Sequence, residues 1–357
     1  MKNLLVYIYP VLLGVLLTSC QRDDDEPLKV TREISRLYVS TSDYQANSNT
    51  NFHNVWAIDP VDSNDFPEIS KIYKFTSAAL GGNTIHYSPV SNGLLFQSSV
   101  NSPVFRDTAI QVMTISRLGV ITNSGLIGNR MYDKVRGMHY TVVVDGMVSQ
   151  DFLLAVNVAD TVNLFAFDKP RNNRGFTKPR FRMELDFNPW AILVNGYDLM
   201  MSKAESDGGI VVYKDYTKKL LNEVDTVIQV AKSFELNIAG AHNIRGMSYS
   251  KAKDILVLTD YVGEGVATEG RILVIEKFST FSTNAEITPS RIIKSSKLVQ
   301  PLDVAIDPRP EGKFLYVADP VARRVFRFSI DDDGLVNPNQ ELNLMNRAPQ
   351  SLSLDAR

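Results

Sequence analysis

The chain has 357 residues, a formal net charge of −2 and a hydrophobic fraction of 44%. So small a charge gives no global basic field, which excludes general electrostatic attraction to nucleic acid. The single cysteine excludes a disulfide framework and a cysteine-based metal cluster. A chain of this length without disulfides must therefore bury a large apolar core.

The first residues have the pattern of an export signal. Lys2 supplies a positive start, and residues 4–17 form an apolar run that is too short to span a bilayer comfortably. The run ends in Leu17-Thr18-Ser19-Cys20, which resembles a bacterial lipobox. The resemblance implies a signal peptide over residues 1–19 and lipidation of Cys20. The alternative is an ordinary secretory signal with an incidental cysteine.

An acidic run, Asp23-Asp24-Asp25-Glu26, follows directly. It resembles the surface-export signal of Bacteroidota lipoproteins, which implies an outer-membrane lipoprotein that is surface-exposed or otherwise faces the periplasm. A solvated tether is the alternative, because blocks of like charge stay unfolded. We expect a tether over residues 20–33 and one folded domain over residues 34–357. No second apolar run is long enough to cross a membrane.

Six short apolar runs predict a repeated strand, the second of each repeat. They cover residues 36–41, 94–99, 152–157, 197–202, 255–260 and 314–319. Their starts lie about 45–59 positions apart, the spacing of a four-stranded β-propeller blade with its loops. A third strand follows each run, at residues 55–58, 110–115, 162–167, 210–213, 272–275 and 325–330. Weaker outer strands are expected after most of these, for example over residues 69–75 and 226–234.

The predicted inner strands repeat a short motif. Residues 135–140 are VRGMHY and residues 244–249 are IRGMSY, which share Arg-Gly-Met-x-Tyr. Pro189, Pro301 and Pro349 fall in register at the start of their inner strands, where a sheet tolerates proline.

The ends of the chain predict how the sheets close. The run at residues 36–41 has only the acidic tether before it, whereas residues 349–355 form an inner strand with no partner after it. We therefore predict an all-β, six-bladed β-propeller in which the C-terminal strand completes the N-terminal blade and removes an open edge. An open β-sandwich array is the alternative. Residues 299–330, and less clearly 243–277, resemble six-bladed propellers of the NHL and gluconolactonase-like kind.

The loops that enter the inner strands are expected to form a cup at the mouth of the channel. Its predicted ligand-binding residues are polar or aromatic: Asn83, Arg136, Trp190, His242, Arg245 and Gln350. Arginine offers paired planar donors for carboxylate, phosphate or sugar hydroxyls. We expect a non-catalytic binding or interaction module for a glycan, a peptide or an envelope protein. A merely hydrated polar funnel is the alternative for each residue.

A metal site would indicate a different function. The gluconolactonase-like resemblance implies a divalent cation in the channel, for which Asp260, Asp303 and Asp319 could supply hard oxygen ligands. A metal-dependent hydrolase or lactonase, with calcium as the candidate cation, is therefore the alternative function, although the first blade lacks a counterpart of the family's glutamate. No other cofactor and no catalytic residue is expected. His86 and His139 fall in inner strands, where we expect ordinary packed residues.

The basic stretch of residues 171–182, RNNRGFTKPRFR, is predicted to lie in or before an outer edge strand. Lysine, arginine and proline on an edge discourage pairing between sheets. Protection of that edge is preferred to an anion site.

Overall fold

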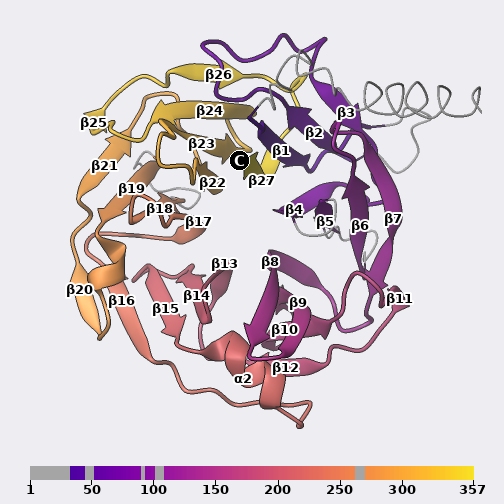
Figure 1. Cartoon of the computed structure of the whole chain (residues 1–357). Helices are drawn as coiled ribbons and strands as arrows, with labels where there is room; N and C mark the ends of the chain where they lie inside the picture. The colour runs from indigo at the N-terminus through magenta and orange to yellow at the C-terminus, as the bar shows by residue number, and fades with distance from the viewer. Residues whose placement is uncertain (1–32, 45–51, 90–92, 101–107, 262–269) are drawn as a thin grey trace, which may run out of the picture. The chain divides into compact units, whose positions relative to one another are not determined.

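The computed structural model describes residues 33–44, 52–89, 93–100, 108–261 and 270–357. Ile34–Arg357 form one compact unit. Its six sheets are arranged radially around a central channel (Figure 1), which confirms the predicted six-bladed β-propeller. Cys20 and the acidic run lie outside the described residues.

Each blade runs from an inner strand at the channel to an outer strand at the rim. Blade 1 contains β27 (Pro349–Ala356), β1 (Ser35–Thr41), β2 (Val55–Ile58) and β3 (Tyr73–Phe75). Blade 2 contains β4 (Gly82–Ser88), β5 (Leu94–Ser99), β6 (Ala109–Ile115), β7 (Ile121–Gly128) and β11 (Gly175–Phe176). Blade 3 contains β8 (Lys134–Asp145), β9 (Val148–Val158), β10 (Val162–Asp168) and β12 (Phe181–Glu184).

The other half of the ring follows the same plan. Blade 4 contains β13 (Pro189–Asn195), β14 (Asp198–Lys203), β15 (Gly209–Tyr213), β16 (Phe234–Ile238) and β20 (Ala285–Ile287). Blade 5 contains β17 (Ile244–Ser250), β18 (Ile255–Asp260), β19 (Arg271–Glu276), β21 (Arg291–Lys294) and β25 (Gly334–Leu335). Blade 6 contains β22 (Asp303–Ile306), β23 (Phe314–Asp319), β24 (Arg324–Ser329) and β26 (Gln340–Leu342). The short helices α2 (Tyr216–Asn222) and η2 (Phe278–Thr280) follow β15 and β19.

The two ends of the described chain close the ring as predicted. β27 pairs antiparallel with β1, from Ser35 opposite Ala356 to Thr41 opposite Pro349. The backbones of Ile34 and Arg357 then exchange two hydrogen bonds beyond the strands. The inner edge of the first blade is therefore completed by the last strand.

Outer edges are covered by neighbouring blades. β11, β20 and β25 each pair in parallel with the outermost strand of the preceding blade, although each follows a strand of the next blade. The basic stretch 171–182 supplies β11 and the start of β12, so its predicted place at a sheet edge is confirmed. The outer strand predicted over 226–234 was misplaced. The outer strand β16 begins only at Phe234, and Val227 instead forms a parallel bridge to Arg182 of blade 3.

Packing between neighbouring blades explains the apolar runs. Every residue of β1, β2, β5 and β15 is buried, since both faces of these strands are covered by adjacent blades.

Within the described ranges, no helix combines the length and the apolar character needed to cross a membrane.

The inner strands are irregular where they enter the channel. In blades 2, 4 and 5 two residues of the inner strand oppose a single residue of the next strand, which defines a β-bulge. The opposing residues all carry hydroxyl groups: Ser98, Ser202 and Thr259. Each hydroxyl accepts a hydrogen bond from a bulged backbone N–H, at Thr84, Ala191 and Gly246. Each also donates to an inner-strand carbonyl of the following blade, at Val135, Arg245 and Leu302.

These hydroxyl groups join the blades at the channel. Thr259 Oγ1 accepts from Gly246 N at 2.8 Å and donates to Leu302 O at 3.2 Å, and the side chain is fully buried. Both backbone groups would be unsatisfied in an apolar environment without it.

We therefore predict that Thr259→Val lowers the free energy of unfolding by about 1–3 kcal/mol, because the shape is kept and two buried polar groups lose their partner. Urea unfolding followed by tryptophan fluorescence measures the change. Thr259→Ser retains the hydroxyl and should cost clearly less. Equal losses in the two variants would contradict this role of the hydroxyl.

Candidate functional site

The predicted mouth residues owe their position to the bulges. Arg136, Trp190 and Arg245 lie where the pairing of their inner strands shifts register. Asn83 and Gln350 occupy equivalent shifts in blades 2 and 1. A bulge turns a side chain away from the regular alternation, and all five side chains are half-buried at these shifts. The register of blade 6 is regular, and Leu302 stands at its mouth position.

The guanidinium groups of two arginines lie over one indole ring at the mouth. The Cζ atom of Arg136, from blade 3, lies 4.5 Å from the ring centroid of Trp190 in blade 4. That of Arg245, from blade 5, lies 4.1 Å from the same ring and 3.4 Å from the Tyr261 ring. The structure therefore brings Arg136, Trp190 and Arg245 together. Trp190 therefore contacts arginine side chains from both neighbouring blades.

The two guanidinium groups have few acceptors. Arg136 donates to the Asn188 side chain and, at 3.4 Å, to the Pro189 carbonyl. Neither Arg136 nor Arg245 forms an ion pair with any described residue, and the buried Nε of Arg245 has no hydrogen-bond partner there. Burial lowers the pKa of Arg245 to about 10, so the group remains charged at neutral pH. Among the described residues, the mouth thus holds two positive charges without a carboxylate partner.

The other predicted ligand residues play smaller parts. Asn83 donates to the Val135 carbonyl at 2.7 Å, and Gln350 donates to the Ser42 hydroxyl at 3.1 Å. Both side chains line the same cavity as Arg136 and Trp190. His242 lies apart, with Nδ1 at 3.4 Å from Asp260 Oδ2 and 3.2 Å from an Arg271 nitrogen. It belongs to an ion-paired loop and not to the cavity lining.

The predicted aspartates do not form a cation site. Asp260 accepts from the backbone N–H groups of His242 and Asn243 and pairs with Arg271 at 2.8 Å. Asp319 accepts from four backbone N–H groups, at Val299, Gln300, Val321 and Ala322. Across the described residues, no three His, Cys, Asp or Glu side chains are grouped so that they could hold a metal. The residues therefore do not fit the divalent cation that the gluconolactonase-like resemblance implies.

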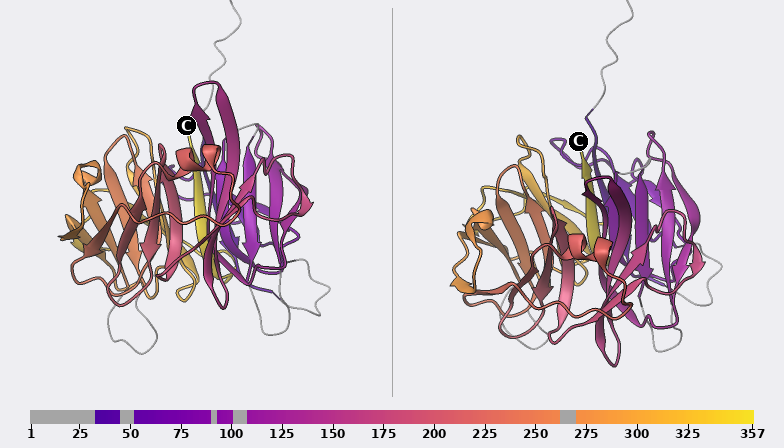
Figure 2. Two further views of the ribbon diagram at one scale, coloured as in Figure 1. Left: turned by 90° about the horizontal axis from the view of Figure 1, so that it is seen from below. Right: turned by 60° about the horizontal axis from the view of Figure 1, so that its bottom comes forward.

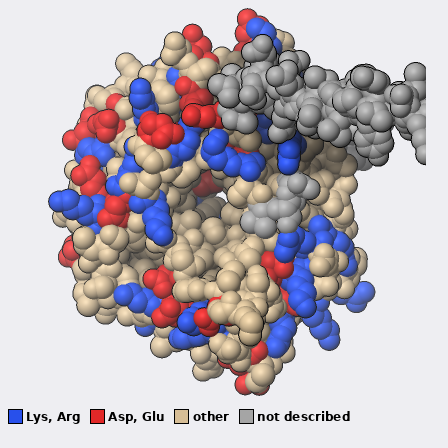
Figure 3. All heavy atoms as spheres, in the orientation of Figure 1, with Lys and Arg blue, Asp and Glu red and all other residues tan. Residues whose placement is uncertain are grey.

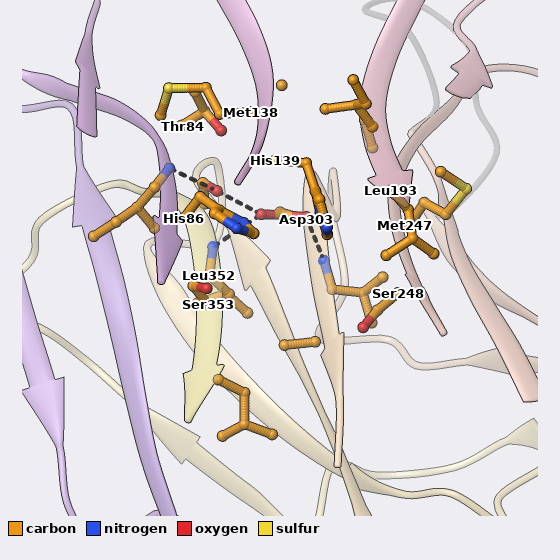
Figure 4. Close-up of a pocket in the computed structure, with 18 of the residues that line it drawn as sticks. Thr84, His86, Met138, His139, Leu193, Met247, Ser248, Asp303, Leu352 and Ser353 are labelled. Carbon is orange, nitrogen blue, oxygen red and sulfur yellow. Dashed lines mark hydrogen bonds between the residues drawn. The ribbon is translucent and has the colours of Figure 1, made fainter. Parts of the chain in front are cut away.

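A cavity of about 250 Å³ extends from the mouth into the channel between the six inner strands. His86 of blade 2 and His139 of blade 3 line it, with ring centroids 4.7 Å apart, and Figure 4 shows both imidazoles pointing into the channel. Burial lowers the pKa of His139 to about 4. Burial and the neighbouring His139 lower the pKa of His86 well below its usual value. Both rings are thus neutral at pH 7 and line the cavity, whereas the sequence suggested ordinary packed residues.

Asp303 joins the last blade to the first inside this cavity. Its Oδ2 accepts from the Ser351 hydroxyl at 2.6 Å and from Leu352 N at 2.9 Å, and its Oδ1 accepts from Val304 N. Burial raises the pKa of Asp303 to about 6, which these hydrogen bonds oppose. Asp303 therefore acts as a link between inner strands.

One sequence signal could have identified the histidine pair. His86 precedes Tyr87 in β4 as His139 precedes Tyr140 in β8, so the two histidines hold the same position in adjacent inner strands. In the Arg-Gly-Met-x-Tyr motif, this is the position marked x. A polar residue repeated between apolar neighbours on inner strands indicates a channel-facing side chain.

Comparison with known proteins supports the fold alone. No protein-family model and no curated protein sequence matches the chain. The crystal structure of a proposed 6-phosphogluconolactonase from Bacteroides uniformis is similar, with a TM-score of 0.51, 11% identity, and coverage of 90% of this chain and 99% of that one. A second protein with that proposed activity, from Bacteroides fragilis, has a TM-score of 0.48, 12% identity, and coverage of 92% and 100%.

The two channel histidines predict an acid-sensitive fold. Between its usual pKa of 6.5 and its folded pKa of about 4, His139 takes up a proton only in the unfolded chain, so stability falls as the pH drops through this range. His139→Gln should reduce that acid-induced loss by up to about 3 kcal/mol near pH 4.

Urea unfolding of the parent and the variant at several pH values between 7 and 4 tests this. Asp303 has a raised pKa and contributes in the opposite direction, with stability that is lost as the pH rises through about 6. It is present in both proteins, so its contribution cancels in the comparison. Parallel stability curves for parent and variant would refute the assignment.

Proposed function

We propose that this propeller binds a small anionic compound of monosaccharide size, whose carboxylate or phosphate group lies at the mouth and whose body enters the channel. The observation that carries the proposal is the arginine pair on Trp190, which has no carboxylate partner among the described residues. Two neighbouring guanidinium groups repel each other, and an anion between them relieves that repulsion.

The volume and the polar lining of the cavity limit the class of ligand that can bind. Its volume of about 250 Å³ is slightly below the range of ordinary small-molecule pockets. An oligosaccharide or a folded partner would not enter it. Polar groups of Asn83 and Gln350 at the rim suit hydroxyl groups, since both side chains donate and accept hydrogen bonds. A sugar acid or a sugar phosphate combines these features.

Isothermal titration calorimetry with gluconate, 6-phosphogluconate and neutral glucose tests the proposal. We expect binding of an anionic sugar, no comparable binding of glucose, and affinity that is about 10–100-fold weaker in Arg245→Gln, because a charged hydrogen bond is lost. Arg180→Gln is the matched control, since Arg180 also stacks on an aromatic ring, Phe181, but at the outer rim. Equal affinity for glucose, or an equal loss in the control, would overturn the proposal.

Hydrolysis of a sugar lactone is the second candidate function. The neutral imidazoles of His86 and His139 line the same cavity as Arg136 and Trp190, where either could accept a proton from water. The similar Bacteroides uniformis structure, itself a proposed 6-phosphogluconolactonase, supports this candidate through its fold only. Because a low pKa makes an imidazole a weak base, we expect slow turnover.

A pH-stat assay with six-carbon sugar lactones measures this activity. We expect acid release above the spontaneous rate, at least tenfold reduced in His139→Gln. EDTA should leave the rate unchanged, because the channel aspartates are not grouped as metal ligands. Binding of a sugar acid without any turnover would refute the lactonase candidate and leave the binding proposal standing.

A further inference from the structure

The hairpin of β8 and β9 projects beyond its blade. The inner strand β8 has 12 residues and its partner β9 has 11, whereas the inner strands of the other blades have four to eight. The projecting part carries exposed apolar side chains: Val144 is 52% exposed, Met147 is 104% exposed and Val148 is 54% exposed. In the left view of Figure 2 the magenta hairpin extends furthest from the blades, on the side where the C-terminus lies.

The projecting hairpin is held rigidly. Lys218 of α2 pairs with Asp145 at 3.4 Å, and the Tyr197 hydroxyl donates to the Val144 carbonyl at 2.7 Å. Val143, on the inward side, is buried against blade 4. One side of the hairpin is therefore fixed to the domain, while its tip presents apolar atoms to the surroundings.

The preceding blade adds an exposed leucine to this face. Leu118, in the turn between β6 and β7, is 89% exposed and follows the exposed residue Arg117. β6 runs away from the mouth, so this turn and the hairpin tip lie on the same face. Figure 3 shows that face with charges of both signs on its rim and mostly uncharged atoms around the central opening.

The chain also enters the domain on this face. Inner strands begin at the mouth and end on the opposite face, so Arg357 after β27 lies on the same face as the tip after β8. Ile34 is hydrogen-bonded to Arg357 and therefore enters there as well. Thirteen residues separate Ile34 from Cys20, and they span at most about 45 Å when extended.

We propose that Met147 and Val148, with Leu118, contact the headgroup region of the membrane to which a lipid on Cys20 holds the domain. The proposal rests on that predicted lipid anchor and not on the ligand at the mouth. A lipid on Cys20 keeps the chain-entry face within reach of the bilayer, where a projecting apolar tip is stabilised by insertion at the interface. The exposed Arg117 suits anionic headgroups.

The single cysteine allows a direct test. A thioether-linked lipid blocks Cys20, so Met147→Cys supplies the one free thiol of the lipidated chain. This thiol is labelled with an environment-sensitive NBD dye, and the protein is placed in phosphatidylethanolamine and phosphatidylglycerol vesicles. We expect a blue shift of the dye and quenching by spin-labelled lipid. Val321→Cys is the matched control, because Val321 is 53% exposed but follows β23 on the mouth side, and it should show neither effect.

The alternative outcomes are separable. Mass spectrometry that finds no fatty acid on Cys20 would overturn the anchor and the proposal together. An unshifted dye on a lipidated chain would overturn the membrane contact alone. A blue shift that needs no vesicles and grows with protein concentration would assign the tip to a second copy of the chain, which also overturns the proposal. Sugar-acid binding at the mouth is measured separately and is independent of these results.

Discussion

The propeller depends on how its bulged inner strands satisfy their backbone hydrogen bonds. A bulge removes ladder partners from buried N–H groups, and in blades 2, 4 and 5 a serine or threonine hydroxyl replaces them. The same hydroxyl then donates to the next blade, so one side chain completes a strand and joins two sheets. Asp303 and Ser351 provide the corresponding link where the last blade meets the first. The apolar clusters between the blades supply most of the burial, but these polar links fix the blades against each other at the channel.

The position of the arginines at the mouth depends on the same bulges. Without the bulges, Arg136 and Arg245 would face the packed interface between blades, where an unpaired charge costs several kcal/mol. With them, both guanidinium groups reach the mouth and stack on Trp190. Gly137 and Gly246, which follow the two arginines, allow the close approach of the next inner strand: a Cβ atom would lie 2.4 Å from Trp190 O and 2.6 Å from the Asp303 Cα. The Arg-Gly pair is therefore one structural unit, with arginine at the mouth and glycine at the contact between blades.

Much of the fold could be predicted from sequence because apolar runs and turn residues directly encode buried strands. Residues 94–99, 255–260 and 314–319 coincide with β5, β18 and β23. Closure could also be predicted, since the first blade lacked an inner strand and residues 349–355 lacked partners. The contacts that each polar side chain makes could not be predicted. Whether Asp260 and Asp319 face a ligand or accept backbone N–H groups depends on the path of the loop before the next inner strand, which periodicity does not encode. The approach of His86 to His139 likewise depends on the angle between two blades.

The two faces of the domain carry different structural features. The mouth carries Arg136 and Arg245, which form no ion pair with the described residues, and it opens into a cavity, whereas the opposite face carries the chain entry, the C-terminus and an apolar hairpin tip. Because every inner strand runs from the first face to the second, a ligand site and an attachment point built on strand ends fall on opposite sides. The proposed membrane contact of the hairpin tip and the proposed ligand site at the mouth therefore lie on opposite faces of the domain. The extension of β8 and β9 lies on the face where Ile34 and Arg357 meet, so it leaves the mouth open.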